Sequence, residues 1–188
     1  MNSKPYLLII TGRPGSGKTT FSKKFGNEIF MPVISRDEIK EGYVHTFGKR
    51  HTELSEESNK IATEIFFNTL KGLIDNTVSI IAEAAFQHEL WSYMLEPFMK
   101  IARIYLLICK TNDKLTLDRF IQRGLNNSFR EYFHGDKSVD MVRKGIDLSI
   151  SPYDEPRLDV PTLYIDTTEN YSPSINELKE AIFGSCCF

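Results

Sequence analysis

The chain has 188 residues, a hydrophobic share of 41%, a charged share of 26% and a formal net charge of -2. This balance is ordinary for a globular protein, so we expect one domain over residues 1–188. The slightly acidic charge argues against a broad basic face for a nucleic-acid duplex, and no apolar run reaches the ~20 residues that span a bilayer. The expected location is therefore the cytoplasm, without a membrane partner. The three cysteines, Cys109, Cys186 and Cys187, match neither a disulfide framework nor a zinc spacing.

Strand-like and helix-like patterns alternate along the chain, which predicts an α/β fold with a mainly parallel sheet. The apolar runs predict strands at Tyr6–Thr11, Met31–Ile34, Val78–Ala82, Ile101–Ile108 and Thr162–Ile165. Helical spacing predicts helices at Lys18–Phe25 and Gln87–Met99. A capping box at Ser35–Glu38 starts a predicted helix that runs to Phe47, and Ser172-Pro173 starts the last one. Single capping residues start three more predicted helices: Ser55 to Ile74, Asn112 to Gly124 and Ser138 to Ile150. Asn126–Asp136 has no periodicity and is expected to be irregular and mobile.

A glycine-rich loop carries the most specific motif of the chain. Residues 12–19 match the pattern GxxxxGK[ST], after a buried strand and at the start of a helix. Glycines let backbone N–H groups converge on phosphate oxygens, Lys18 reaches the β- and γ-phosphates, and the Thr19 hydroxyl coordinates Mg²⁺. The alternative is a glycine-rich turn without a ligand. The motif predicts binding of ATP, or of GTP, with Mg²⁺ through Gly12, Arg13, Pro14, Gly15, Ser16, Gly17, Lys18, Thr19 and Thr20.

With this motif in place, the chain resembles the small P-loop kinases, a group of AAA-family ATPases, zeta-toxin-like kinases and polynucleotide-kinase-like kinases. The resemblance covers nearly the whole chain and also rests on positional likenesses at residues 34–40, 82–86, 117–123 and 164–168. It implies a three-layer P-loop NTPase fold, a five-stranded parallel sheet in the order 2-3-1-4-5, and a mobile lid at about residues 112–137. Ala85 stands where the family more often has asparagine.

Two carboxylates are candidates for the acceptor side. Asp37 lies in the first turn of a predicted helix, at the sheet edge that faces the nucleotide. The resemblance implies that it takes the proton of the acceptor hydroxyl; alternatively, it only complements the helix dipole. Arg36 and Lys40 flank it, and either could hold an anionic part of the acceptor or stay in solvent. Glu83 ends an apolar strand, and a charge there should be paired, hydrated or near a metal, so it is assigned to Mg²⁺-bound water or to the acceptor.

Arginines mark the predicted lid. Arg119 and Arg123 are four residues apart on one helix face, and guanidinium groups suit a transferring phosphoryl group. The resemblance implies that such arginines clamp the γ-phosphate or stack on adenine, whereas the alternative is a pair of solvated side chains. Arg130, in the aperiodic stretch, is a further candidate for substrate binding. Thr167-Thr168 either borders the base or forms only a loop.

These features predict an ATP-dependent phosphotransferase that moves the γ-phosphate to a hydroxyl of a small molecule. Lys18, Arg119 and Arg123 would stabilise charge while Asp37 acts on the acceptor. One alternative is a polynucleotide 5′-hydroxyl kinase, which the acidic balance and the lack of an aromatic-plus-basic cluster disfavour. Another is a nucleotide-dependent ATPase or switch without a transfer substrate, which the short length disfavours.

Overall fold

Five parallel strands form the centre of the molecule, in the order β2-β3-β1-β4-β5. The structure is a computed structural model that describes residues 4–135, 141–146 and 152–184. The strands are β1 (Tyr6–Thr11), β2 (Val33–Ser35), β3 (Ile80–Glu83), β4 (Arg103–Lys110) and β5 (Thr162–Asp166). Strand order and direction confirm the predicted fold. The single-domain organisation stays a prediction.

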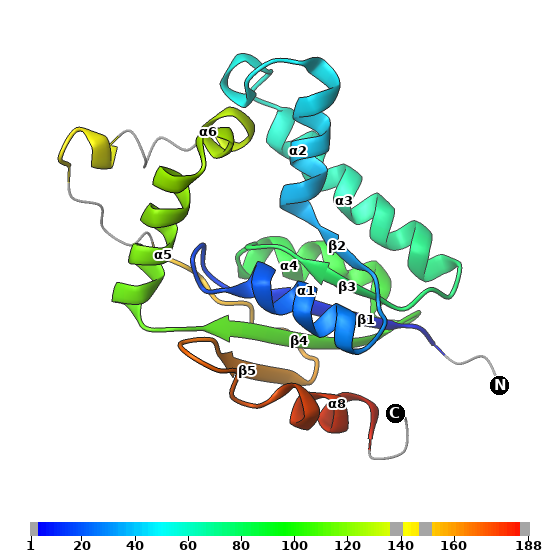
Figure 1. The fold of residues 1–188 in the computed structure, drawn as a ribbon. Helices are drawn as coiled ribbons and strands as arrows, with labels where there is room; N and C mark the ends of the chain where they lie inside the picture. The colour runs from blue at the N-terminus through cyan, green and yellow to red at the C-terminus, as the bar shows by residue number, and fades with distance from the viewer. Residues whose placement is uncertain (1–3, 136–140, 147–151, 185–188) are drawn as a thin grey trace.

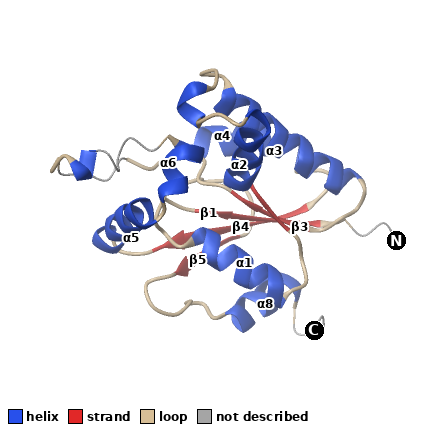
Figure 2. Ribbon diagram, turned by 45° about the horizontal axis from the view of Figure 1, so that its top comes forward, coloured by secondary structure: helices blue, strands red, loops and turns tan. Residues whose placement is uncertain are grey.

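Helices cover both faces of this sheet (Figure 2). α1 (Lys18–Glu28) and α8 (Ile175–Phe183) lie on one face; α2 (Arg36–Phe47), α3 (Ser58–Asp75) and α4 (His88–Leu95) lie on the other. Two short 3₁₀ helices, η1 (His51–Glu53) and η2 (Glu96–Phe98), follow α2 and α4. α5 (Asp113–Asn126) leaves the carboxyl end of β4, and α6 (Ser128–His134) then turns towards α2 (Figure 1).

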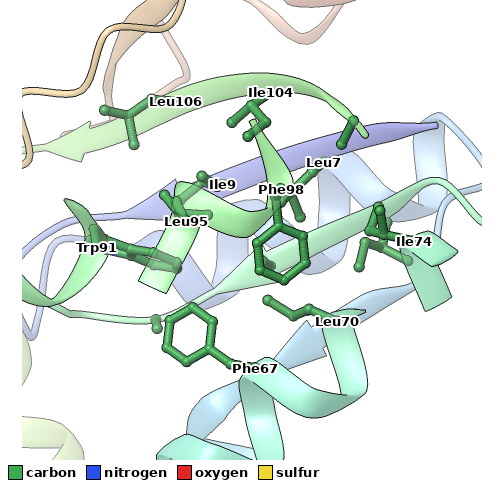
Figure 3. Packing of buried hydrophobic residues seen from close by; sticks show 14 of the residues in the cluster. Leu7, Ile9, Phe67, Leu70, Ile74, Trp91, Leu95, Phe98, Ile104 and Leu106 are labelled. Atoms are coloured by element: carbon green, nitrogen blue, oxygen red, sulfur yellow. The ribbon is translucent and has the colours of Figure 1, made fainter. Parts of the chain in front are cut away.

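Strand β1 supplies apolar side chains to two cores. Leu7 and Ile9 join the cluster formed with α3, α4 and η2, where Phe98 and Trp91 are almost fully buried (Figure 3). Leu8 and Ile10 join the cluster formed with α1 and α8 on the opposite face. Both sets are buried because successive strand residues point to opposite faces, which explains why β1 is a continuous apolar run. The rigid sheet fixes the position of the loop that follows β1.

The lid region differs from the prediction. Asn112 caps α5, since its side chain accepts the Leu115 N–H at 2.8 Å, but Gly124 does not end the helix. Gly124 is buried within α5, which continues to Asn126. Residues 128–134, expected to be irregular, form α6, capped by the side chain of Asn127. Two helical turns are too short to show periodicity in a sequence.

The predicted helix from Ser138 to Ile150 is not continuous. Residues 141–143 are helical, but the chain turns at residues 144–145, where Gly145 has a φ of 72°. Ser138 and Ile150, like Cys186-Cys187, lie outside the described residues. Gly145 adopts the left-handed conformation that commonly ends a helix.

Several boundaries also move by two or three residues. β2 and β4 begin and end later than predicted, and β3 begins at Ile80 instead of Val78. Ser55 does not cap α3; its hydroxyl accepts the Glu57 N–H, and the helix begins at Ser58. Pro173 is not the first residue of α8 because Ser174 forms the cap, in a capping box with Glu177. Among the described residues, no helix combines the length and apolarity needed to cross a membrane.

Candidate active site

The loop between β1 and α1 has a backbone that depends on glycine. Gly12, Gly15 and Gly17 have φ angles of 146°, 90° and 82°, which L side chains rarely adopt. A Cβ atom on Gly12 would lie 2.5 Å from the carbonyl oxygen of Cys109, and one on Gly17 would lie 3.2 Å from Oγ1 of Thr167. The loop is therefore closely packed against β4 and the loop after β5, at the N-terminus of α1.

A cavity of about 200 Å³ adjoins this loop. It is the site where a helix N-terminus and successive backbone N–H groups would meet an anion. Its lining residues come from the loop, from α1 and from α5: Gly15, Gly17, Lys18, Thr19, Thr20, Arg119 and Arg123. The structure thus brings five of the nine nucleotide-binding residues predicted from the motif next to both predicted lid arginines.

Lys18 and Glu83 form a buried ion pair beside this cavity. Nζ of Lys18 lies 3.9 Å from Oε1 of Glu83. The carboxylate also accepts hydrogen bonds from Thr19 Oγ1, at 3.2 Å, and from Ser35 Oγ, at 2.7 Å. Burial lowers the pKa of Lys18 and the charge of Glu83 opposes that shift; burial likewise raises the pKa of Glu83 and the charge of Lys18 opposes it. Lys18, Thr19 and Ser35 thus hold Glu83 beside the glycine loop of residues 12–19, which we call the cradle.

Ser35 is a site residue whose role differs from the prediction. It occupies the cap position of α2, but its hydroxyl makes no capping hydrogen bond and donates to Glu83 instead. Glu38, the expected partner in the capping box, pairs with Lys23 at 2.6 Å. The β2–β3 register sets Ser35 opposite Glu83. The hydroxyl therefore donates to this carboxylate, because an ionised carboxylate is a strong hydrogen-bond acceptor.

The oxygen atoms of Thr19 and Glu83 suit Mg²⁺. The two hard donors lie 3.2 Å apart at the edge of the cradle, and Mg²⁺ commonly takes one or two protein oxygens with phosphates and water. In the described part of the chain, no group of three or more His, Cys, Asp or Glu residues could hold a metal. The donor set therefore fits a metal shared with a phosphate ligand.

A larger cavity of about 410 Å³ adjoins the glycine loop and is lined by Asp37 and Lys18 among others. It brings together residues from the P-loop, from α2, from the loop after β3, and from α5 and α6. They are Pro14, Lys18, Arg36, Asp37, Lys40, Ala85, Phe120, Arg123, Arg130, His134 and Gly135. Three of the predicted substrate residues, Asp37, Lys40 and Arg130, thus share one cavity, and the fourth, Glu83, pairs with its neighbour Lys18.

Asp37 is the carboxylate of this cavity. Its Oδ1 lies 3.7 Å from Nη1 of Arg36, and its side chain is 48% exposed. Burial by itself would raise the pKa of Asp37, but the charges of His134, Lys18, Arg36 and Arg130 outweigh that effect and lower it. Asp37 is therefore ionised at neutral pH in a strongly positive surrounding.

Arg119 is fixed by the loop after β5. Its two terminal nitrogens each donate to the carbonyl oxygen of Thr167 at 3.1 Å, and Nη2 also donates to that of Thr168 at 2.9 Å. The Thr167 hydroxyl in turn donates to the Ser16 carbonyl oxygen at 2.6 Å. Arg123 instead lines both cavities. The two arginines lie on one helix, but Arg119 braces the loop after β5 while Arg123 lines the cavity that contains Asp37.

The end of α6 rests on α2. The ammonium of Lys40 donates to the carbonyl oxygen of His134 at 3.4 Å, and Nε2 of His134 lies 2.8 Å from Oε1 of Glu41. The ring of Phe133 packs 4.9 Å from that of His45, measured between centroids. These contacts join α6 to α2 (Figure 1), and both Lys40 and His134 line the larger cavity.

His134 and Phe120 are lining residues that the sequence did not assign to the site. His134 lies in the segment whose sequence has no periodicity, and its position in the cavity depends on residues 128–134 forming a helix against α2. Arg13, in contrast, directs its side chain to Asp113, 3.1 Å away, and lines neither cavity. It contributes to the loop through its carbonyl oxygen, which accepts the Ser16 N–H.

Together, the 2-3-1-4-5 parallel sheet, the glycine loop and the buried Lys18–Glu83 pair define a P-loop kinase-like fold. The chain belongs to the AAA domain family, whose family model matches residues 7–144. This confirms the resemblance drawn from the sequence.

Solved structures share the fold across almost the whole chain. A protein from Chloroflexus aurantiacus, provisionally assigned as a kinase, is 22% identical, with a TM-score of 0.73 over 97% of this chain and 96% of that one. A sugar kinase from Janibacter sp. is 14% identical, with a TM-score of 0.58 over 98% and 99%. The APS kinase of Mycobacterium tuberculosis, solved with AMPPNP and APS, is 14% identical, with a TM-score of 0.57 over 95% of each chain. At these identities the likeness concerns the fold.

Proposed function

We propose that the protein is an ATP-dependent phosphotransferase that moves the γ-phosphate to a hydroxyl of a small molecule. The observation that carries this proposal is the position of Asp37. It lines the larger cavity together with Lys18 and Arg123, and both of these also line the smaller cavity at the P-loop. A hydroxyl beside Asp37 would therefore lie next to the end of a triphosphate held by the cradle.

The residues suggest an in-line transfer. The bond between the γ-phosphorus and the β–γ bridging oxygen breaks, and its electron pair leaves with ADP. A bond forms between the γ-phosphorus and the acceptor oxygen, whose proton passes to the carboxylate of Asp37. Lys18 and Arg123 would stabilise the negative charge on the transferring group. A carboxylate with a lowered pKa suits a loose transition state, in which the hydroxyl loses its proton late.

Thr19 and Glu83 would hold Mg²⁺, which neutralises charge on the β- and γ-phosphates when bound. An adenine nucleotide is the proposed donor, with GTP as the alternative, because the related fold of the Mycobacterium tuberculosis APS kinase binds AMPPNP. We propose the cytoplasm as the location, since ATP is available there.

A nucleotide-dependent ATPase or switch is the main alternative. The test is γ-³²P transfer from ATP with Mg²⁺ across nucleosides, sugars, antibiotics and 5′-hydroxyl oligonucleotides, with Lys18→Met as the inactive control. The proposal predicts that ADP forms only with an acceptor and in equal amount to the labelled product. Substantial ADP formation without any labelled acceptor would favour the ATPase, and labelling of oligonucleotides alone would favour a polynucleotide kinase.

A further inference from the structure

A chain of hydrogen bonds runs through the end of β1, directly before the cradle. Nε1 of Trp91 donates to Oγ1 of Thr11 at 3.3 Å, and the Thr11 hydroxyl lies 3.1 Å from that of Tyr153. The Tyr153 hydroxyl donates to the carbonyl oxygen of Phe86 at 3.2 Å. Burial raises the pKa of Tyr153, so this hydroxyl keeps its proton at neutral pH. Because that single proton goes to Phe86, the Thr11 hydroxyl donates to the oxygen of Tyr153.

This chain connects the cradle to one side of the larger cavity. Thr11 is the last residue of β1, is fully buried, and directly precedes Gly12, the first glycine of the cradle. Phe86 directly follows Ala85, which lines the larger cavity. Tyr153 therefore joins the start of the cradle to the loop after β3.

Ala85 has an anchored neighbour on each side. The N–H of Ala84 donates to the carbonyl oxygen of Ile10 at 3.2 Å. On the other side, the carbonyl oxygen of Phe86 accepts the hydroxyl of Tyr153. Both anchors lead to the end of β1, directly in the first case and through a tyrosine side chain in the second. The tyrosine hydroxyl thus completes the attachment of this loop to the strand that carries the cradle.

The backbone around Tyr153 is held in place without its hydroxyl. The carbonyl oxygen of Asp154 accepts the His88 N–H at 2.9 Å. Glu155 pairs with Lys110, at the end of β4, at 2.9 Å. Substitution of Tyr153 by phenylalanine leaves these contacts and the aromatic ring in place, so it isolates the effect of the hydroxyl.

Resting on the proposed kinase function, we propose that Tyr153 is a positioning residue for the acceptor. Its hydroxyl fixes Ala85, and with it one side of the larger cavity, relative to Gly12. This sets the acceptor hydroxyl relative to the end of the triphosphate. Tyr153 acts through Phe86 and Thr11 and not on the reacting atoms. Because phosphoryl transfer depends on the alignment of the two reactants, loss of this contact lowers kcat without weakening nucleotide binding.

The first measurement needs no acceptor. Trp91 is the only tryptophan of the chain, so its indole N–H gives a single resonance in a ¹H–¹⁵N spectrum. In Tyr153→Phe we expect this resonance to shift, because its acceptor Thr11 loses a partner. Amide hydrogen exchange of residues 84–86 should rise roughly tenfold, as expected for the loss of one hydrogen bond. Exchange of the cradle and the Kd for AMPPNP with Mg²⁺ should match those of the wild type.

Further variants test the route through Thr11. Tyr93→Phe is the matched control, since it removes the hydroxyl of an exposed tyrosine on α4 and should leave the exchange of residues 84–86 unchanged. Thr11→Val removes the other hydroxyl of the chain and should raise this exchange, and it carries the test if Tyr153→Phe does not fold. The double variant should exchange no faster than the faster single variant, because groups that act through one chain of hydrogen bonds are not additive.

Steady-state kinetics separate positioning from structural support once an acceptor is known. Tyr153→Phe should lower kcat roughly tenfold to a hundredfold, while the KM for ATP stays that of the wild type. A purely structural role predicts a lower melting temperature and a normal kcat at temperatures where the variant is folded.

Failure of this proposal is distinct from failure of the kinase. If the wild type binds AMPPNP but Tyr153→Phe leaves the indole resonance and the exchange of residues 84–86 unchanged, the positioning role is wrong and the kinase proposal remains. The positioning role is also wrong if exchange rises equally in the cradle, or if kcat is normal. If the wild type does not bind AMPPNP, the kinase proposal itself fails.

Discussion

Nζ of Lys18 lies 3.9 Å from Oε1 of Glu83, and the two side chains are only 7% and 3% exposed. This buried pair joins the helix after the P-loop to the end of β3. Removing one partner of a buried pair leaves an uncompensated charge, so the two side chains position each other. Burial lowers the pKa of Lys18, and the nearby carboxylate opposes that shift by favouring the charged form of the ammonium.

Lys18→Met should weaken ATP binding roughly tenfold or more, which corresponds to about 1.4 kcal/mol or more. The substitution removes the charge that would meet the β- and γ-phosphates but keeps the length of the buried side chain. Calorimetry with Mg²⁺ and AMPPNP measures the effect. Lys24→Met, at an exposed position on the same helix, is the control and should bind as the wild type does. Equal affinity in both variants would contradict the assignment of the cradle.

Arg119→Lys should lower the free energy of unfolding by about 1–3 kcal/mol, because the single nitrogen of a lysine cannot reproduce the hydrogen bonds that the two terminal nitrogens of the guanidinium make to the Thr167 and Thr168 carbonyl oxygens. Nucleotide affinity should fall as well, since Thr167 packs against Gly17 of the cradle. Urea unfolding and AMPPNP titration measure the two effects. Arg103→Lys is the control. An unchanged stability would show that these hydrogen bonds do not brace the loop.

Nucleotide binding should stabilise the docking of α6 on α2. His134 contacts Glu41 and Lys40 of α2 and lines the larger cavity, and Arg123 of the preceding helix lines both this cavity and the P-loop cavity. Amide hydrogen exchange of Phe129–Phe133 should slow when Mg²⁺ and AMPPNP are added. Exchange in α8, on the opposite face of the sheet, is the internal control. Protection restricted to residues 12–19 would contradict a role of α6 as a lid.

The sheet and the cradle could be predicted because their signals are local. A buried apolar strand followed by GxxxxGK[ST] predicts the strand, the loop and the helix after it, and Asp37 and Glu83 each follow a predicted strand. The position of His134 could not be predicted, because it depends on a contact between α6 and α2. His134 and Glu41, which form a pair in this contact, are 93 residues apart in the sequence. The role of Ser35 was missed for a similar reason, since a local capping pattern competed with a long-range bond to Glu83.

The surrounding cations should control the ionisation of Asp37. Burial raises the pKa of this carboxyl, but the charges of His134, Lys18, Arg36 and Arg130 lower it below 3.8. Because the folded pKa is depressed, the stabilisation it gives is present above the unfolded pKa and is lost as the pH falls through the folded value. A ¹³C titration of the carboxyl group in the free protein should show a pKa below 3.8, and Arg130→Gln should raise it. A pKa above 3.8 in the wild type would contradict this balance of charges.

The most direct test of the central claim is phosphoryl transfer by Asp37→Asn, measured together with its affinity for ATP. Asparagine keeps the shape and hydrogen-bonding reach of the side chain but cannot accept the proton of the acceptor. The account predicts that transfer falls by roughly 10²–10⁴, the usual contribution of a general base, while the Kd for ATP stays within a few-fold of the wild type. Loss of ATP binding together with transfer would place Asp37 on the metal instead. Near-normal transfer by Asp37→Asn would contradict the proposed mechanism.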